Sequence, residues 1–198
     1  NPNAAIGKPT GAGVVFISFF VLLTFLVIIP SPFQTCVLLL TLASMLTGFL
    51  DDRSTKSWGE YLKGTLDLII AVVACVALYF LYFKQNVQFW FPFTSNVYNI
   101  HPAVFFIVSI PLIWFSINTT NCSDGVDGLS GMLVLMALLS LGSIFYFVLG
   151  HVKVAEYLLV PNIQDGARWA VIIFSLAGVL IGYIWHNAHP SSVLMGDA

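Results

Sequence analysis

A short polar segment between two long apolar stretches carries the side chains most suited to chemistry. Residues 118–128 read NTTNCSDGVDG, and the carboxylates of Asp124 and Asp127 are three positions apart. Gly125 and Gly128 have the same spacing. Residues three apart share one face of a helical turn, so one face would be acidic and another would let a ligand approach the backbone. Acids at a membrane boundary are costly and usually mark a substrate or ion site.

A second acidic pair, Asp51 and Asp52, follows the apolar run that ends in GFL. The helix dipole is negative at a C-terminal end, so two adjacent carboxylates there need a compensating cation. That cation is either a bound metal or one of three nearby basic side chains, Arg53, Lys56 and Lys63. The alternative is a solvated loop in which the acids pair with those basic residues and have no further role.

Two further acids extend the set. Asp197 closes the polar stretch NAHPSSVLMGD, which begins at Asn187. Carboxylate and amide oxygens that converge without a cluster of Cys or His favour a hard cation, and Mg²⁺ is the cofactor we expect. Asp67 lies inside an apolar run, where an acid is a functional candidate, yet its carboxylate is near enough to the end of the run to reach the interface. Both interpretations of Asp67 stay open.

Membrane-spanning helices must position these side chains. Of the 198 residues, 59% are apolar and 8% are charged, whereas about a quarter are charged in soluble domains. The mean hydropathy is +0.94, and the ten-residue alternation of a β-barrel is absent. We therefore predict an all-α fold, a polytopic transmembrane helical bundle that forms a single membrane domain over residues 1–198. Six apolar runs approach the roughly 20 residues that cross a bilayer. They are Ala12 to Ile29, Phe33 to Leu50, Thr65 to Phe83, Ala103 to Ile117, Leu129 to Leu149 and Trp169 to Trp185.

Six crossings distribute the polar loops over two sides of the membrane. Residues 1–11, 51–64, 118–128 and 186–198 fall on one side, which contains all the acidic motifs. That side carries four basic residues against three opposite, which favours the cytoplasm. The opposite loops include an aromatic run, residues 89–93, that is typical of an interfacial anchor. The net charge of −2 and the lack of a basic patch exclude nucleic acid as a partner.

Two local expectations concern the ends of the acidic segment. The fourth apolar run is short and contains Pro111, so its helix is either kinked or continues into the polar residues that follow. The helix that begins near Leu129 needs partners for its first N–H groups, and Asn121, Ser123 or Asp124 is expected to cap it.

The polar motifs resemble those of a known family. The segment NCSDGVDGLSG is similar to the Asn-x-x-Asp-Gly-x-Asp-Gly motif of the polyprenyl-phosphate sugar-1-phosphate transferases. Residues 48–52, residues 9–11 with Gly13, and residues 187–197 match the other cytoplasmic motifs of that family in the same order. The resemblance covers essentially the whole chain and implies a fold of about ten spans, of which this chain would be the middle part. Ser123, the hydroxyl residue before Asp124, and the motif of Pro9 and Thr10 favour the muramoyl-pentapeptide branch. The branch that uses UDP-N-acetylglucosamine is the runner-up.

The resemblance implies a Mg²⁺-dependent phosphotransferase of peptidoglycan biosynthesis. Undecaprenyl phosphate would attack the sugar-bound phosphorus of UDP-N-acetylmuramoyl-pentapeptide, UMP would leave, and lipid I would form. One substrate is a lipid and the other is a cytosolic nucleotide. The resemblance therefore places the site where the lipid bilayer meets the cytoplasm, at the cytoplasmic face of the bacterial inner membrane. The oligomeric state stays open, a homodimer included.

The resemblance also implies a role for each candidate residue. Asp197 would bind the metal, and Asp51 or Asp52 would act on the lipid phosphate, either as a base or as a covalent nucleophile. Lys56 or Lys63 would offset the charge of the lipid phosphate. The nucleotide side would be formed by Asn121, Asp124, Gly125, Val126, Asp127 and Asn187.

Two other classes compete with the enzyme interpretation. An ion or solute transporter also concentrates acids in membrane helices, but it places them near the bilayer midplane. A structural subunit would need no acidic constellation. Because the acidic motifs flank their spans on one side, the sequence favours an enzyme that works at the membrane interface.

Overall fold

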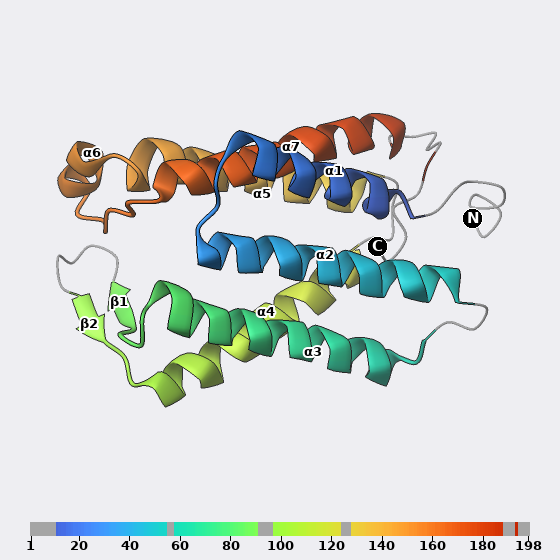
Figure 1. The fold of residues 1–198 in the computed structure, drawn as a ribbon, viewed down its shortest axis with the longest axis horizontal. Helices are drawn as coiled ribbons and strands as arrows, with labels where there is room; N and C mark the ends of the chain where they lie inside the picture. The colour runs from blue at the N-terminus through green and yellow to red at the C-terminus, as the bar shows by residue number, and fades with distance from the viewer. Residues whose placement is uncertain (1–10, 55–57, 91–96, 124–127, 188–192, 194–198) are drawn as a thin grey trace.

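The structure, a computed structural model, describes residues 11–54, 58–90, 97–123, 128–187 and 193. Its long helices run roughly along one common direction (Figure 1). In chain order, the elements are α1 (Ala12–Val27), α2 (Pro32–Arg53), α3 (Glu60–Ala77), η1 (Leu78–Tyr82), β1 (Gln88–Trp90), β2 (Val97–Asn99), α4 (Pro102–Ser123), α5 (Leu129–Ser143), η2 (Ile144–Leu149), α6 (Val152–Tyr157) and α7 (Gly166–Asn187).

Each of the six predicted apolar runs forms a helix, which confirms the all-α polytopic membrane fold. Over the described residues, five helices are long and apolar enough to cross a membrane: α2, α3 with η1, α4, α5 with η2, and α7. The first helix, α1, has 16 residues and is shorter than the run predicted to end at Ile29. Helical conformation is disfavoured just before a proline, and the chain is already extended at Ile28, two residues ahead of Pro30. Of the six predicted spans, five are therefore confirmed at full length among the described residues, and α1 is shorter than predicted.

The second helix shows why it begins where it does. Ser31 and Gln34 form a capping box, in which the Ser31 hydroxyl accepts from the Gln34 N–H and the Gln34 side chain accepts from the Ser31 N–H. Pro32 occupies the first helical position, where a missing N–H costs nothing. The turn between α1 and α2 is therefore closed by local hydrogen bonds.

The fourth helix runs through Pro111 and continues to Ser123, so the prediction that it extends into the polar segment is confirmed. Its hydroxyl side chains bond to the backbone of the preceding turn: Ser116 donates to the Leu112 carbonyl, and Thr120 donates to the Ser116 carbonyl. Such bonds satisfy hydroxyl groups inside a helix without a partner on a neighbouring element.

Small residues let α5 lie close to α7. A Cβ atom on Gly142 would come within 2.9 Å of the Phe174 ring and 3.2 Å of the Ile173 side chain. On the same helix, a Cβ atom on Gly131 would come within 3.1 Å of Ile184. Membrane helices associate largely through close packing, and small residues at the contact permit it.

One end of the bundle collects the polar termini of the long helices. The beginnings of α1, α3 and α5 and the ends of α2, α4 and α7 all lie towards the right of Figure 1. For the described residues, this arrangement places the helix ends that flank the predicted acidic loops at one end of the bundle, as the count of crossings predicts. We call this side the acidic end.

The opposite end contains two elements that the sequence did not predict. Strands β1 and β2 form an antiparallel hairpin in which Phe89 faces Tyr98 in register, and the short helix α6 (Val152–Tyr157) lies at the same end of the bundle, apart from the hairpin (Figure 1). Three-residue strands are too short to show a period, so the aromatic run was interpreted only as an anchor.

We expect Gly142→Leu to destabilise the full-length protein, because the added side chain overlaps Phe174 and Ile173. Overpacking of this kind costs about 1–3 kcal/mol. Thermal unfolding in detergent measures the effect, and Gly178→Leu is the matched control, since a Cβ atom there meets nothing within 4 Å. Equal melting temperatures for the two variants would contradict the proposed α5–α7 contact.

Candidate active site

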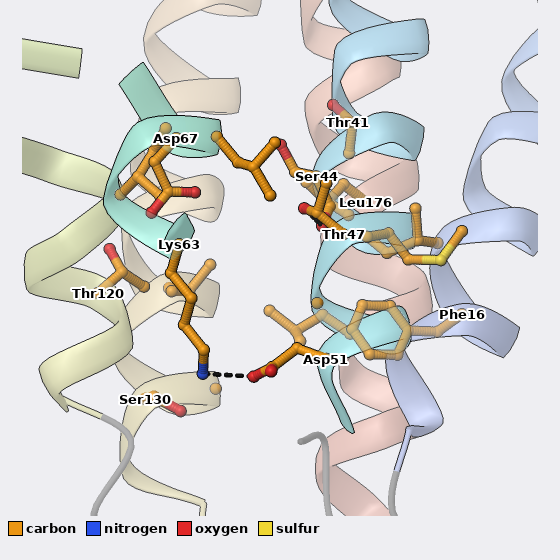
Figure 2. A pocket seen from close by; sticks show the side chains of 18 of the residues that line it. Phe16, Thr41, Ser44, Thr47, Asp51, Lys63, Asp67, Thr120, Ser130 and Leu176 are labelled. Carbon is orange, nitrogen blue, oxygen red and sulfur yellow. Dashed lines mark hydrogen bonds and ion pairs between the residues drawn. The ribbon is translucent and has the colours of Figure 1, made fainter. Parts of the chain in front are cut away.

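A buried carboxylate lies at the centre of the acidic end. Asp51 occupies the last turn of α2, and its side chain is only 6% exposed. One carboxylate oxygen, Oδ2, lies 2.5 Å from the Lys63 Nζ atom, a contact drawn in Figure 2. The other, Oδ1, accepts a hydrogen bond from the Trp58 N–H at 2.6 Å. A buried charge is tolerated when it is both paired and hydrogen-bonded, and Asp51 meets both conditions.

The same residue also organises the connection between α2 and α3. The Asp51 carbonyl accepts from both the backbone N–H and the hydroxyl of Ser54, at 3.0 and 2.8 Å, as the helix ends. The Asp51 carboxylate then holds the chain again at Trp58, just before α3 begins at Glu60. The backbone carbonyl of Asp51 thus fixes the start of the α2–α3 connection at Ser54, and its carboxylate fixes the end of that connection at Trp58.

The cation that the acidic pair requires is Lys63. Among the described candidates, Lys63 pairs with Asp51, while Arg53 is exposed and Lys56 lies outside the described residues. The alternative interpretation, a solvated loop paired with its own basic residues, is half right for Asp51: the carboxylate pairs with Lys63, but it is buried and lies in the last turn of α2. Asp52 lies in the same turn and is exposed.

Beside this ion pair, a cavity of about 340 Å³ opens among the helices (Figure 2). Its walls come from α1, α2, α3, α4, α5 and α7, together with Trp58 of the α2–α3 connection. Asp67 faces the cavity from α3, one helical turn beyond Lys63. The polar lining is Thr41, Ser44, Thr47, Asp51, Lys63, Asp67, Thr120 and Ser130. The cavity therefore presents two carboxylates, one ammonium group and several hydroxyls inside a helical membrane bundle.

A second contact joins the beginning of α5 to the end of α7. Gly128 has φ +77°, a left-handed conformation that favours glycine, and its N–H donates to Asn187 Oδ1 at 2.8 Å. The Asn187 Nδ2 atom donates to the Val193 carbonyl at 2.9 Å. Asn187 is 6% exposed, so its amide is a buried link between three stretches of chain.

This contact lies at the N-terminus of α5, where Gly128 occupies the cap position and, as a glycine, has no side-chain cap bond of its own. The side chains of Asn121, Ser123 and Asp124, predicted to cap α5, lie outside the described residues, so that cap stays a prediction. The left-handed turn at Gly128 directs its N–H towards α7, where the Asn187 amide accepts from it.

The structure brings together only part of the predicted site. Asp51 and Lys63 are in contact, Asp52 is adjacent to them in sequence, and Asn187 lies in the second contact at the same end. Asn121 lies in the last turn of α4, and only its backbone is described. The remaining predicted residues lie outside the described part: Lys56, Asp124, Gly125, Val126, Asp127 and Asp197.

The predicted magnesium site remains a prediction. Within residues 11–54, 58–90, 97–123, 128–187 and 193, no group of three His, Cys, Asp or Glu side chains could hold a metal ion. Asp197, the expected ligand, is outside these ranges. Asp51 is a poor ligand in this arrangement, because both of its oxygens already bind N–H donors.

Sequence reasoning missed the hydroxyl side chains of α2 that line the cavity. Thr47 precedes Asp51 by four positions, Ser44 precedes Thr47 by three, and Thr41 precedes Ser44 by three. Such spacings place side chains on one helix face. A hydroxyl stripe that leads to an acid within an apolar run was the signal that would have identified this wall.

Comparison with known proteins matches residues 34–198 to the family described as glycosyl transferase family 4. A phospho-N-acetylmuramoyl-pentapeptide-transferase of Treponema pallidum is 58% identical over 194 residues, which cover 98% of this chain and 53% of that protein. Proteins of the same name from Aliarcobacter butzleri and Aquifex aeolicus are 34% and 30% identical, over 100% and 96% of this chain and 58% and 54% of their own lengths. The chain thus spans about half the length of the curated relatives it matches.

We expect Lys63→Met to lower the stability of the full-length protein, because it leaves the Asp51 carboxylate buried without its cation. Removing one partner of a buried pair costs about 3–5 kcal/mol, and we expect about 2 kcal/mol because Lys63 is 37% exposed. Thermal unfolding in detergent measures this loss, and adding Asp51→Asn should recover part of it.

The matched control is Arg168→Met at the opposite end. Arg168 and Asp165 form an ion pair of 3.3 Å in which both side chains are largely exposed, so the loss there should stay below about 1 kcal/mol. If both lysine and arginine variants lose the same stability, the special position of the Asp51 pair is contradicted.

Proposed function

Because the chain belongs to glycosyl transferase family 4, we propose that the whole protein transfers phospho-N-acetylmuramoyl-pentapeptide from its UDP carrier to undecaprenyl phosphate. An oxygen of the lipid phosphate forms a bond to the sugar-bound phosphorus, the bond from that phosphorus to UMP breaks, and UMP leaves. The products are lipid I and UMP, in a step of peptidoglycan biosynthesis. The relatives that bear the name of this activity support the assignment.

The observation that carries the proposal is the buried, cation-paired Asp51 beside a polar cavity at the acidic end. Phosphoryl transfer needs mainly positioning and charge neutralisation. A lipid phosphate that entered the cavity would meet the Lys63 ammonium group, which can offset its charge. The apolar helix surfaces around the site provide a route for the polyprenyl chain to remain in the bilayer.

Asp51 is the group we assign to the lipid phosphate, with Asp52 beside it. In one route Asp51 accepts the proton of the lipid phosphate and so acts as a base. In the other it attacks the sugar-bound phosphorus of the donor, and UMP leaves as the covalent intermediate forms; an oxygen of the lipid phosphate then bonds to that phosphorus and the Asp51 carboxylate is released. Both routes require the Asp51 carboxylate to exchange at least one of its present N–H partners for substrate.

The contact between Gly128 and Asn187 supports a nucleotide side. It fixes the chain directly after the segment 124–127 and keeps the end of α7 against the beginning of α5. We propose that the uridine diphosphate part binds here, through Asn187 and the residues of the motif that precedes α5. Those residues are Asn121, Asp124, Gly125, Val126 and Asp127.

We propose that Asp197 holds a Mg²⁺ ion. Oxygen donors suit this metal, and the engagement of Asp51 with Lys63 supports a ligand other than Asp51. When bound, the ion would supply positive charge to the diphosphate of the donor. We also propose that the acidic end faces the cytoplasm of the bacterial inner membrane, because the nucleotide donor is cytosolic, and that the whole protein can pair as a homodimer.

The activity is tested with the full-length protein in lipid nanodiscs, supplied with undecaprenyl phosphate, Mg²⁺ and UDP-N-acetylmuramoyl-pentapeptide. UMP release is expected, and UDP-N-acetylglucosamine in its place should give none. Asp51→Asn should reduce the rate by about 100-fold or more, since a positioned acid or base contributes that much. Asp165→Asn, on the far side of the bundle, should leave the rate unchanged. A folded protein that releases no UMP would overturn the proposed function.

The metal assignment has its own test. Removing divalent ions with EDTA should abolish UMP release, and added Mg²⁺ should restore it. Asp197→Asn should raise the Mg²⁺ concentration needed for half-maximal rate by about tenfold or more. An unchanged requirement in that variant would exclude Asp197 as the ligand.

A further inference from the structure

Asp67 is a cavity residue to which the proposed reaction assigns no role. It lies in the second turn of α3, whose membrane-spanning stretch is Glu60–Tyr82. Its side chain lines the same cavity as Asp51 and Lys63, and Figure 2 shows it one turn deeper in the bundle than Lys63. An acid inside a membrane span is costly, so it usually has both a partner and a purpose.

Lys63 is the cation available to Asp67. Of the described residues that line the cavity, it is the only basic one. The two residues are four positions apart on α3, which places their Cβ atoms about 5–6 Å from each other on one helix face. The lysine side chain is long and flexible. Small torsional changes can therefore carry its ammonium group from the Asp51 carboxylate towards the Asp67 carboxylate.

The structure shows Lys63 in one of these two positions, bound to Asp51. Nζ of Lys63 lies on Asp51 Oδ2, across the gap between α3 and α2. While this contact persists, the Asp51 carboxylate is neutralised and shielded, and a neutralised carboxylate is a poor base and a poor nucleophile. For Asp51 to react, the Lys63 ammonium group must leave the Asp51 carboxylate and bind another anionic group that lines the same cavity.

We propose that Asp67 is a positioning residue that shares the Lys63 ammonium group with Asp51. This inference rests on the proposed function. When the lipid phosphate enters, Lys63 moves to a position between the phosphate and Asp67, and Asp51 is released to act on the substrate. Lys63 keeps its proton throughout, and neither Lys63 nor Asp67 forms or breaks a covalent bond.

The kinetic test uses the full-length enzyme with Asp67→Asn. The rate constant kcat should fall by roughly tenfold, since small losses of positioning reduce rates by up to about 100-fold. The KM for the UDP-sugar should not change, because the uridine diphosphate part is proposed to bind at Asn187 and the motif before α5, and not at Asp67. Asp67→Glu, which keeps the charge, should recover most of the rate. Asp165→Asn is the matched control, an Asp→Asn change at an ion pair of the opposite end.

A second measurement needs no substrate and no activity. The folded protein is treated with an amine-acylating reagent, and modification of Lys63 is followed by peptide mass spectrometry. A neighbouring carboxylate keeps an amine protonated and unreactive, and Asp51 supplies one at rest, so the comparison is made in an Asp51→Asn background, where adding Asp67→Asn should make Lys63 react about tenfold faster. Asp165→Asn should leave the Lys63 rate unchanged. If Asp67→Asn does not fold, Asp67→Gln serves as the second neutral variant.

The two measurements separate the possible failures. An unchanged Lys63 acylation rate in the neutral variants would overturn the sharing of the ammonium group. Faster acylation with an unchanged kcat would overturn the positioning role. A folded parent protein that releases no UMP would overturn the proposed function instead, and the acylation rates would still decide whether Asp67 acts on Lys63.

Discussion

The Asp51 carboxylate is the constraint on which the acidic end depends. A negative charge at the C-terminal end of a helix is disfavoured by the helix dipole, and burial increases that cost. The chain meets the cost with two N–H donors, the ammonium group of Lys63 on α3 and the backbone N–H of Trp58 just before it. The requirement to satisfy one carboxylate therefore fixes how α3 packs against α2. The same ion pair forms part of the wall of the polar cavity that lies among the helices.

Much of this arrangement could be predicted from the sequence because it depends on composition and on chain order. Apolar runs of sufficient length have to become helices in a bilayer, where all backbone groups must be bonded internally. Each crossing changes the side, so the common location of the acidic loops follows from counting. The need for a cation beside Asp51 follows from the helix dipole alone. The family could be recognised from the order of four short motifs, before any geometry was known.

What could not be predicted depends on contacts between distant residues. Three basic residues were candidates for Asp51, and the choice of Lys63 follows from the way α3 faces α2. The contact between Gly128 and Asn187 of α7 could not be predicted, because local spacing gives no sign that two residues so far apart in the chain would meet. The β1–β2 hairpin was missed because strands of three residues show no periodicity. Sequence patterns thus specified the elements, while tertiary packing selected the partners.

The bond between Gly128 and Asn187 also has a consequence for the timing of biogenesis. The two residues are 59 positions apart in the chain. At about 5–20 residues per second, a ribosome needs roughly 3–12 s to synthesise that interval. During this time the Gly128 N–H has no amide partner from α7, and water is the alternative at the membrane boundary. The ion pair between Asp51 and Lys63 can form well before that. The acidic end can therefore assemble in two stages, with the Asp51–Lys63 pair available first and the Gly128–Asn187 contact completed only after α7 has been synthesised.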